Sequence, residues 1–203
     1  MNFQVTDGGS PLRESNGGAA ELARAVRISL CGLDLGRTAS FVPQSLATAD
    51  FDWQQWLRTE FSGGLGKAYI SVFQHAGQMQ VRELIEVDRS LGGDACRDAG
   101  AALLERLEEA KDLRVVDRMR AVLADGERPH FATAFAVECA EFHLPLRAAL
   151  ISYLYGEWRC GMSALGEKGD LDAFAAAGGQ LVFKVVGDAL TQGDSPFENA
   201  AGL

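Results

Sequence analysis

The chain has 203 residues, of which 47% are hydrophobic, and this length suffices for one domain with a well-buried core. With 19 basic and 28 acidic residues, its net charge of −9 argues against nucleic acid or an anionic membrane surface as a partner. No apolar run is long enough to cross a bilayer, and no basic segment followed by an apolar run opens the sequence. The negative charge fits solubility, with a basic protein partner as the alternative.

The first fifty residues are predicted to be largely irregular. Residues 1–17 are dominated by Gly, Ser, Asn and Pro without periodicity, which predicts a disordered arm. Leu22, Val26 and Leu30 are spaced four apart and predict a helix over residues 19–30. Residues 33–49 show no period and are expected to form an irregular turn.

A helix is predicted to follow, capped by Asp50 or Asp52 and ending near residue 61. The next segment, 62–67, reads SGGLGK and resembles a phosphate loop only superficially. Phe61 stands where that loop needs its first glycine, and Ala68 where it needs Ser or Thr. We therefore expect no nucleotide binding and interpret the segment as a flexible turn between two helices.

Apolar periodicity predicts four more helices before the centre of the chain, over residues 68–79, 81–91, 95–110 and 113–124. Met79 is expected inside the first of them. Asp88 lies on the apolar face of the second. A buried carboxylate is more often paired than catalytic, so we expect Asp88 to make a structural hydrogen bond.

Residues 130–166 are predicted to form a helical hairpin at the centre of the domain. The first arm, through Phe142, is apolar nearly all round, as a fully buried helix would be. Pro145 interrupts it and suits the first position of the second arm, where its missing N–H is not needed. Leu150 and Leu154 belong to the apolar stripe of that second arm.

The C-terminal part is predicted to contain one long helix. Asp170 is suited to cap it, and its stripe runs from Leu171 to Leu190. The sequence shows no internal repeat and no clean alternation of period two. We predict an all-α fold, with one compact multi-helix domain over residues 18–192, between the arm and a flexible tail at 193–203.

A search for catalytic and metal-binding patterns yields little. No nucleophile–base, metalloprotease or dinucleotide motif is present, so we expect no catalytic residue and no cofactor. The best cluster is Glu138, Cys139, Glu141 and His143, with His130 upstream. Cys139 and His143 are four apart and could share a helix face toward one metal ion. The favoured interpretation is that Cys139 fills the core and His143 caps the helix end, so no metal site is predicted.

None of the four cysteines forms a C-x-x-C pair with another, and their helical neighbours are mostly apolar. Such cysteines fit reduced thiols that fill space in a core, which favours a cytoplasmic protein. They are Cys31, Cys96, Cys139 and Cys160.

The hairpin resembles the UreF family of urease accessory proteins. The order and spacing of four groups of residues carry the resemblance. They are Pro129, His130, Phe131 and Phe135; Leu144, Pro145 and Leu146; Ala149, Tyr153 and Leu154; and Ser163, Ala164, Leu165 and Gly166. Ser40, Phe41, Ser45 and Leu46 match in kind the residues of a second family signature. The family's glycines and closing glutamate are missing from that turn, the 163–167 segment is shorter, and the family's C-terminal segment is absent.

The resemblance implies an all-helical adaptor and not an enzyme. UreF-type proteins join a urease-bound scaffold protein to a nickel-delivering GTPase, and they tend to dimerise. It further implies a partner face formed by the turn at 38–46 and the start of the hairpin, with Ser40, Ser45, His130 and Glu167 as contact residues. The alternative for the serines and His130 is that they only cap helices.

A second class of function stays open at this point. Compact helical enzymes, such as thiaminase-like and heme-oxygenase-like proteins, line a central pocket with aromatic, Cys and Glu residues. Tyr153, Tyr155, Glu157, Trp158 and Cys160 fit that description, although their helical spacing also explains them as core and rim.

Overall fold

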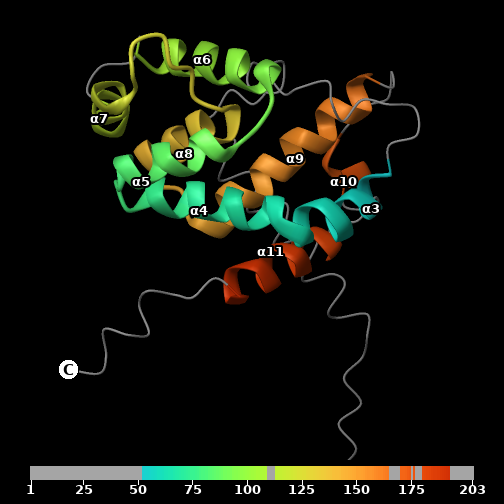
Figure 1. Ribbon diagram of the computed structural model, residues 1–203. Helices are drawn as coiled ribbons and strands as arrows, with labels where there is room; N and C mark the ends of the chain where they lie inside the picture. The colour runs from blue at the N-terminus through green and yellow to red at the C-terminus, as the bar shows by residue number, and fades with distance from the viewer. Residues whose placement is uncertain (1–51, 109–112, 165–169, 175, 177–179, 193–203) are drawn as a thin grey trace, which may run out of the picture.

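The computed structural model describes residues 52–108, 113–164, 170–174, 176 and 180–192 (Figure 1). Every regular element in these ranges is a helix, which confirms the all-α fold. The predicted arm, the helix over 19–30, the turn at 38–46 and the tail lie outside the described residues. The elements are α3 (Trp53–Trp56), the π-helical segment η2 (Leu57–Leu65), α4 (Gly66–Gly77), α5 (Val81–Ser90), α6 (Asp94–Glu108), α7 (Arg114–Val122), α8 (Phe131–Glu141), α9 (Leu146–Ala164), α10 (Leu171–Phe174) and α11 (Gln180–Gln192).

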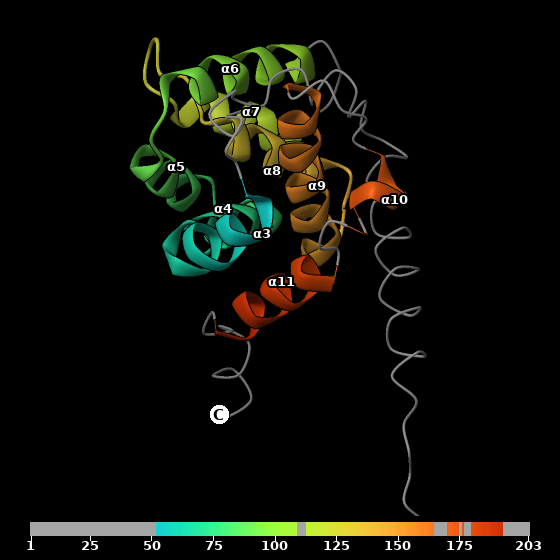
Figure 2. The same ribbon diagram turned by 90° about the vertical axis from the view of Figure 1, so that its right-hand side faces the viewer.

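Helix α8 is the centre of the molecule. All residues from 131 to 139 are buried, because this helix carries apolar or small side chains on nearly every face. It packs most extensively between α4 and α6, with α7 and α9 as further neighbours. In both views α6 and α7 lie at one end of the molecule and α11 at the opposite end (Figure 1, Figure 2). Leu150 and Leu154 of α9 are fully buried, as predicted, so the hairpin does form the core.

The turn of the hairpin is closed by backbone geometry. Helix α8 ends at Glu141, and His143 takes a left-handed conformation with φ of 53°. The N–H of His143 donates to the carbonyl of Ala140, and the N–H of Leu144 donates to the carbonyl of Cys139. This pair of bonds is a Schellman motif, which satisfies the last carbonyls of the helix. Pro145 lies one position before α9 and accepts the N–H of Ala149 instead of being the first helical residue.

The segment 62–67 is not the flexible turn that the sequence predicted. Segment η2 runs directly into α4 with a kink at Gly64. A Cβ atom on Gly66 would lie 2.4 Å from the carbonyl oxygen of Phe61, so the absence of a side chain lets the two elements join without a loop. The expected cap does form, because Asp52 Oδ1 accepts the N–H groups of Gln54 and Gln55 at 2.9 and 3.1 Å.

One further expectation needs correction. Met79 is 39% exposed and not buried, because α4 ends at Gly77 and Met79 takes the left-handed position of a second Schellman motif, with φ of 57°. Of the long C-terminal helix that was predicted, the structure describes two parts, α10 and α11, and residues 175 and 177–179 between them lie outside the described ones. The predicted cap of the first is present, since Asp170 Oδ1 accepts the N–H of Ala173 at 2.8 Å.

Gly100 sets the distance between α6 and the start of α8. A Cβ atom at this position would lie 2.1 Å from the carbonyl oxygen of Pro129 and 2.8 Å from the backbone nitrogen of Phe131. These are backbone atoms at the start of the buried helix, so they cannot turn aside as a flexible side chain could. The close approach of the two helices therefore requires glycine.

We predict that Gly100→Ala lowers the free energy of unfolding by about 3 kcal/mol or more, because overpacking against backbone forces the helices apart. Urea denaturation of the two proteins measures this. The matched control is Gly77→Ala, where an added Cβ meets nothing within 4 Å. That change should be neutral or slightly stabilising. Equal stability of the Gly100 variant and the native chain would contradict the packing described here.

Candidate functional site

Residues 123–130 lead the chain into α8, and we call this segment the hairpin entrance. Asp88, near the end of α5, anchors His130, the last residue of the hairpin entrance. The Asp88 carboxylate is fully buried, and its Oδ1 accepts the backbone N–H of His130 at 2.7 Å. Its Oδ2 accepts from Nη1 of Arg97 at 2.9 Å. Both oxygens are therefore paired, as a carboxylate removed from water requires, and the predicted structural hydrogen bond of Asp88 is confirmed.

The guanidinium of Arg97 extends this anchor to three backbone carbonyls. It donates to the carbonyls of Asp88 and Leu91 at 2.9 and 2.8 Å, where α5 ends. A cationic side chain is favoured at the C-terminal end of a helix. It also donates to the carbonyl of Arg128 in the hairpin entrance at 2.8 Å. One side chain on α6 thus fixes both the end of α5 and the path into α8.

His130 is buried, with 3% of its surface exposed. Its Nδ1 accepts the N–H of Ala132 at 3.1 Å and so caps α8. Burial lowers the pKa of His130 to about 4, with the charge of Arg97 adding to the effect and Asp88 opposing it. The imidazole is therefore neutral at pH 7, as an accepting Nδ1 requires. The structure places this side chain inside the described fold, in the capping role that the sequence left as the alternative.

The outer part of the hairpin entrance is held by ion pairs. Glu127 accepts from Nε and Nη2 of Arg89 at 2.7 and 3.0 Å, and from the N–H of Ala124 at 2.8 Å. The hydrogen bonds from Arg89 and Ala124 lower the pKa of the Glu127 carboxyl to about 2. Arg128 forms an ion pair with Asp98 of α6, in which both side chains are exposed.

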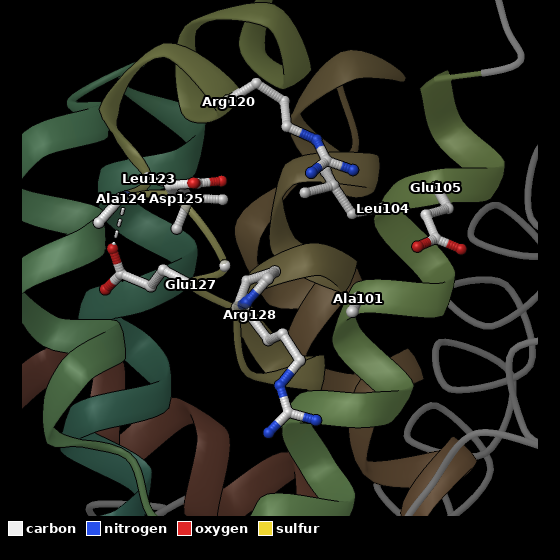
Figure 3. Close-up of a pocket in the computed structure, with 11 residues that line it drawn as sticks. Ala101, Leu104, Glu105, Arg120, Leu123, Ala124, Asp125, Glu127 and Arg128 are labelled. Carbon is white, nitrogen blue, oxygen red and sulfur yellow. Dashed lines mark hydrogen bonds between the residues drawn. The ribbon is translucent and has the colours of Figure 1, made fainter.

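A hollow of about 360 Å³ lies beside the hairpin entrance (Figure 3). Ala101 and Leu104 of α6 form its floor, and Glu105 of the same helix lies across from Arg120 of α7. Arg128 projects from the hairpin entrance near Ala101 (Figure 3). Exposed groups of both signs thus surround a small apolar floor, on backbone that the buried anchor fixes.

A second cavity, of about 510 Å³, is lined in part by His130. Tyr69 of α4 and Tyr153 of α9 line it, with ring centroids 5.1 Å apart, and the ring of His130 lies 6.2 Å from that of Tyr69. Glu157 of α9 and Cys96 of α6 complete the polar lining. Burial raises the pKa of Glu157 to about 7, an effect that its hydrogen bond with Tyr153 reduces.

Comparison with known proteins decides the family. The model of the UreF family matches residues 52–165, which is more than half of the chain. The chain belongs to the UreF family. No curated protein and no solved structure matched it. The match covers the helical core from α3 to the end of α9, including the hairpin that carries the resemblance.

Membership of the UreF family makes this a urease accessory protein, a class of proteins that serve the assembly of a nickel enzyme and are not catalysts themselves. No helix among the described residues has the length and hydropathy that crossing a membrane requires. The aromatic group that suggested an enzyme pocket does not converge on one place. Tyr153 and Glu157 line the cavity, whereas the rings of Tyr155 and Trp158 each lie 5.2 Å from Phe174.

The cluster at the end of α8 is divided among separate structural roles in this UreF-family chain. Glu138 pairs with Arg106 of α6 at 2.9 Å. The Glu141 carboxylate accepts the N–H groups of Val115 and Val116, so it caps the start of α7. Each side chain is thereby committed to a neighbouring helix.

The two weak metal candidates do not share a helix face. Cys139 is buried, and burial together with the Glu138 charge raises the pKa of its thiol well above the usual value. His143 lies beyond the end of α8 and is exposed. No group of three or more His, Cys, Asp or Glu able to hold a metal ion occurs in the part of the chain that the structure describes.

Ser40, Ser45 and Glu167 lie outside the described residues, so their partner role stays a prediction. Sequence reasoning missed Arg97, Glu127 and Tyr69. One partner of Arg97, the carbonyl of Arg128, lies 31 residues away in the chain, and the cationic partner of Glu127, Arg89, lies 38 residues away. No local period indicates such distant pairs. The one sequence signal for Arg97 was Asp88. Its position on an apolar helix face predicted that its carboxylate would have a hydrogen-bonding partner, but not which residue that partner is.

We predict that Asp88→Asn lowers the free energy of unfolding by about 3 kcal/mol. The variant leaves Arg97 without its charged partner and presents an amide N–H₂ to a guanidinium, and breaking a buried ion pair costs about 3–5 kcal/mol. The 19% exposure of Arg97 keeps the loss at the lower end. The control is Asp98→Asn, which breaks the exposed pair with Arg128 and should change stability little. Urea denaturation measures both, and equal losses would refute the anchor.

Proposed function

We propose that this UreF-family protein is an adaptor in the assembly of a urease-type nickel active site, bridging a scaffold accessory protein and a GTPase. The observation that carries the proposal is the family match over residues 52–165. The proposal includes self-association and a place in the cytoplasm, where its cysteines would remain reduced.

We further propose that the hairpin entrance forms a partner face. The hollow of Figure 3 supports this, because exposed charges of both signs surround an apolar floor there. The anchor of Asp88 and Arg97 fixes the backbone before any partner binds, which reduces the ordering cost of association. Ser40, Ser45 and Glu167 are proposed to belong to the same face. For His130, the proposal is that it holds the face in place from beneath.

The test is co-expression with the urease scaffold protein and the GTPase of the same organism, followed by co-purification. We expect Arg128→Glu to reduce recovery of at least one partner at least tenfold. Its melting temperature should stay within a few degrees of the native value, since it changes an exposed ion pair. The matched control is Lys184→Glu on α11, an exposed residue at the opposite end of the molecule, which should leave recovery unchanged (Figure 1).

His130→Ala separates anchoring from direct contact. Loss of the cap should lower the free energy of unfolding by about 1 kcal/mol, and partner recovery should fall only in proportion to folded protein. Ser45→Ala should reduce recovery with an unchanged melting temperature if Ser45 belongs to the partner face. Failure of both partners to co-purify with the native chain would refute the adaptor function. Full recovery with Arg128→Glu would refute the location of the face.

A further inference from the structure

The second cavity, which His130 lines, contains a carboxylate that the described residues leave incompletely bonded. Glu157 of α9 is 6% exposed, and its hydrogen bond with the Tyr153 hydroxyl satisfies part of the carboxylate. Its Oε1 has no hydrogen-bond partner among the described residues. A buried polar atom without a partner is unfavourable, so its persistence beside an open volume indicates a site for a donor.

No positive charge among the described residues that line the cavity compensates Glu157. The lining contains neither Lys nor Arg, and burial keeps His130 neutral at pH 7. Arg97 is close to Cys96, but its guanidinium is bound to Asp88 and to the carbonyls at the end of α5 and in the hairpin entrance. An ionised Glu157 would therefore favour a cation from outside these elements.

The residues that line the cavity suit a planar cation. Trp56, Tyr69 and Tyr153 present aromatic rings to it, and its volume is about 510 Å³. Arginine stacks on aromatic faces and forms forked hydrogen bonds with carboxylates, whereas lysine carries a compact and strongly hydrated charge. Apolar side chains such as Leu65 and Leu91 complete the lining, where the methylene stem of an arginine could pack.

We propose that this cavity receives the guanidinium of one arginine side chain from a partner protein, with its charge paired to Glu157. The inference rests on the proposed adaptor function and deepens it, since it gives the adaptor a second, chemically defined point of recognition. The occupant is a side chain of a partner because the cavity combines one acidic group with apolar and aromatic side chains, which match the charged head and the methylene stem of an arginine.

The pH dependence of binding follows from the groups that face Glu157. Burial raises the pKa of Cys96 to about 11, and it raises the pKa values of Tyr69 and Tyr153 well above their ordinary value. Burial lowers the pKa of His130 to about 4. Of the groups lining the cavity, Glu157 is therefore the one that changes its charge between pH 6 and 8, around its pKa of about 7. A cation that pairs with the ionised form should bind about tenfold more tightly at pH 8 than at pH 6.

The direct test is calorimetric titration of the full-length protein with N-acetyl-arginine amide, at pH 8 and pH 6. N-acetyl-citrulline amide, which has nearly the same shape without the charge, is the matched probe. We expect binding of the arginine probe at pH 8, about tenfold weaker binding at pH 6, and no heat from the citrulline probe. Equal binding of the two probes, or no binding of either, would overturn the proposal.

Glu157→Gln should reduce binding of the arginine probe at least tenfold, whereas Glu83→Gln, an exposed change on α5, should not. The variant must also remain folded. The pKa of Glu157 is raised in the folded state, so its carboxylate destabilises the native chain as pH rises through about 7. Glu157→Gln should therefore raise the melting temperature at pH 8 and change it little at pH 5. A lower melting temperature at pH 8 without probe binding would mean that the chain itself fills the site, and would refute the proposal.

Co-purification separates this inference from the proposed function. If both partners are recovered equally with the native chain and with Glu157→Gln, and the arginine probe does not bind, the arginine site is refuted and the adaptor stands. The opposite outcome is that neither partner is recovered, while the native chain binds the arginine probe and Glu157→Gln does not. In that case the adaptor function is refuted, and so is a partner protein as the source of the arginine, but the guanidinium site itself stands.

Discussion

The carboxylate of Asp88 is the interaction on which the arrangement of this molecule depends. One of its oxygens binds the guanidinium of Arg97, and the other binds the backbone N–H of His130. A buried charge must be paired, so α5, α6 and the start of α8 are bound to one point. Gly100 allows α6 to approach that point at backbone distance. The start of the central helix is thus fixed in place by these contacts.

Two hollows of different character adjoin this point. The hollow of Figure 3 is bordered by the exposed charges of the hairpin entrance, and the second cavity by aromatic residues and Glu157. The backbone of His130 is tied to Asp88, and His130 also lines the second cavity. A backbone that the Asp88 anchor holds in place would lose little conformational freedom if another protein bound here.

The residues that looked chemically interesting in the sequence serve the fold. Glu138 pairs with Arg106, and Glu141 caps α7. Cys139 fills the core. Membership of the UreF family agrees with this division, since the family consists of accessory proteins and not of catalysts. Glu157 differs from these residues, because it lines a cavity in which its Oε1 has no hydrogen-bond partner among the described residues.

The sequence by itself determined the helices, the caps at Asp52 and Asp170, the buried hairpin and the family, because these depend on local spacing and on short runs of residues. The sequence also predicted that Asp88, on an apolar helix face, would have a hydrogen-bonding partner. The identity of that partner was decided by the tertiary structure, as was the bond from His130, which lies 42 residues further along the chain. The exposure of Met79, the direct junction at Gly66 and the cavity beside Glu157 were decided in the same way. Each depends on how helices meet, and the distance between two helices is set by the packing of all of them and not by the period of either one.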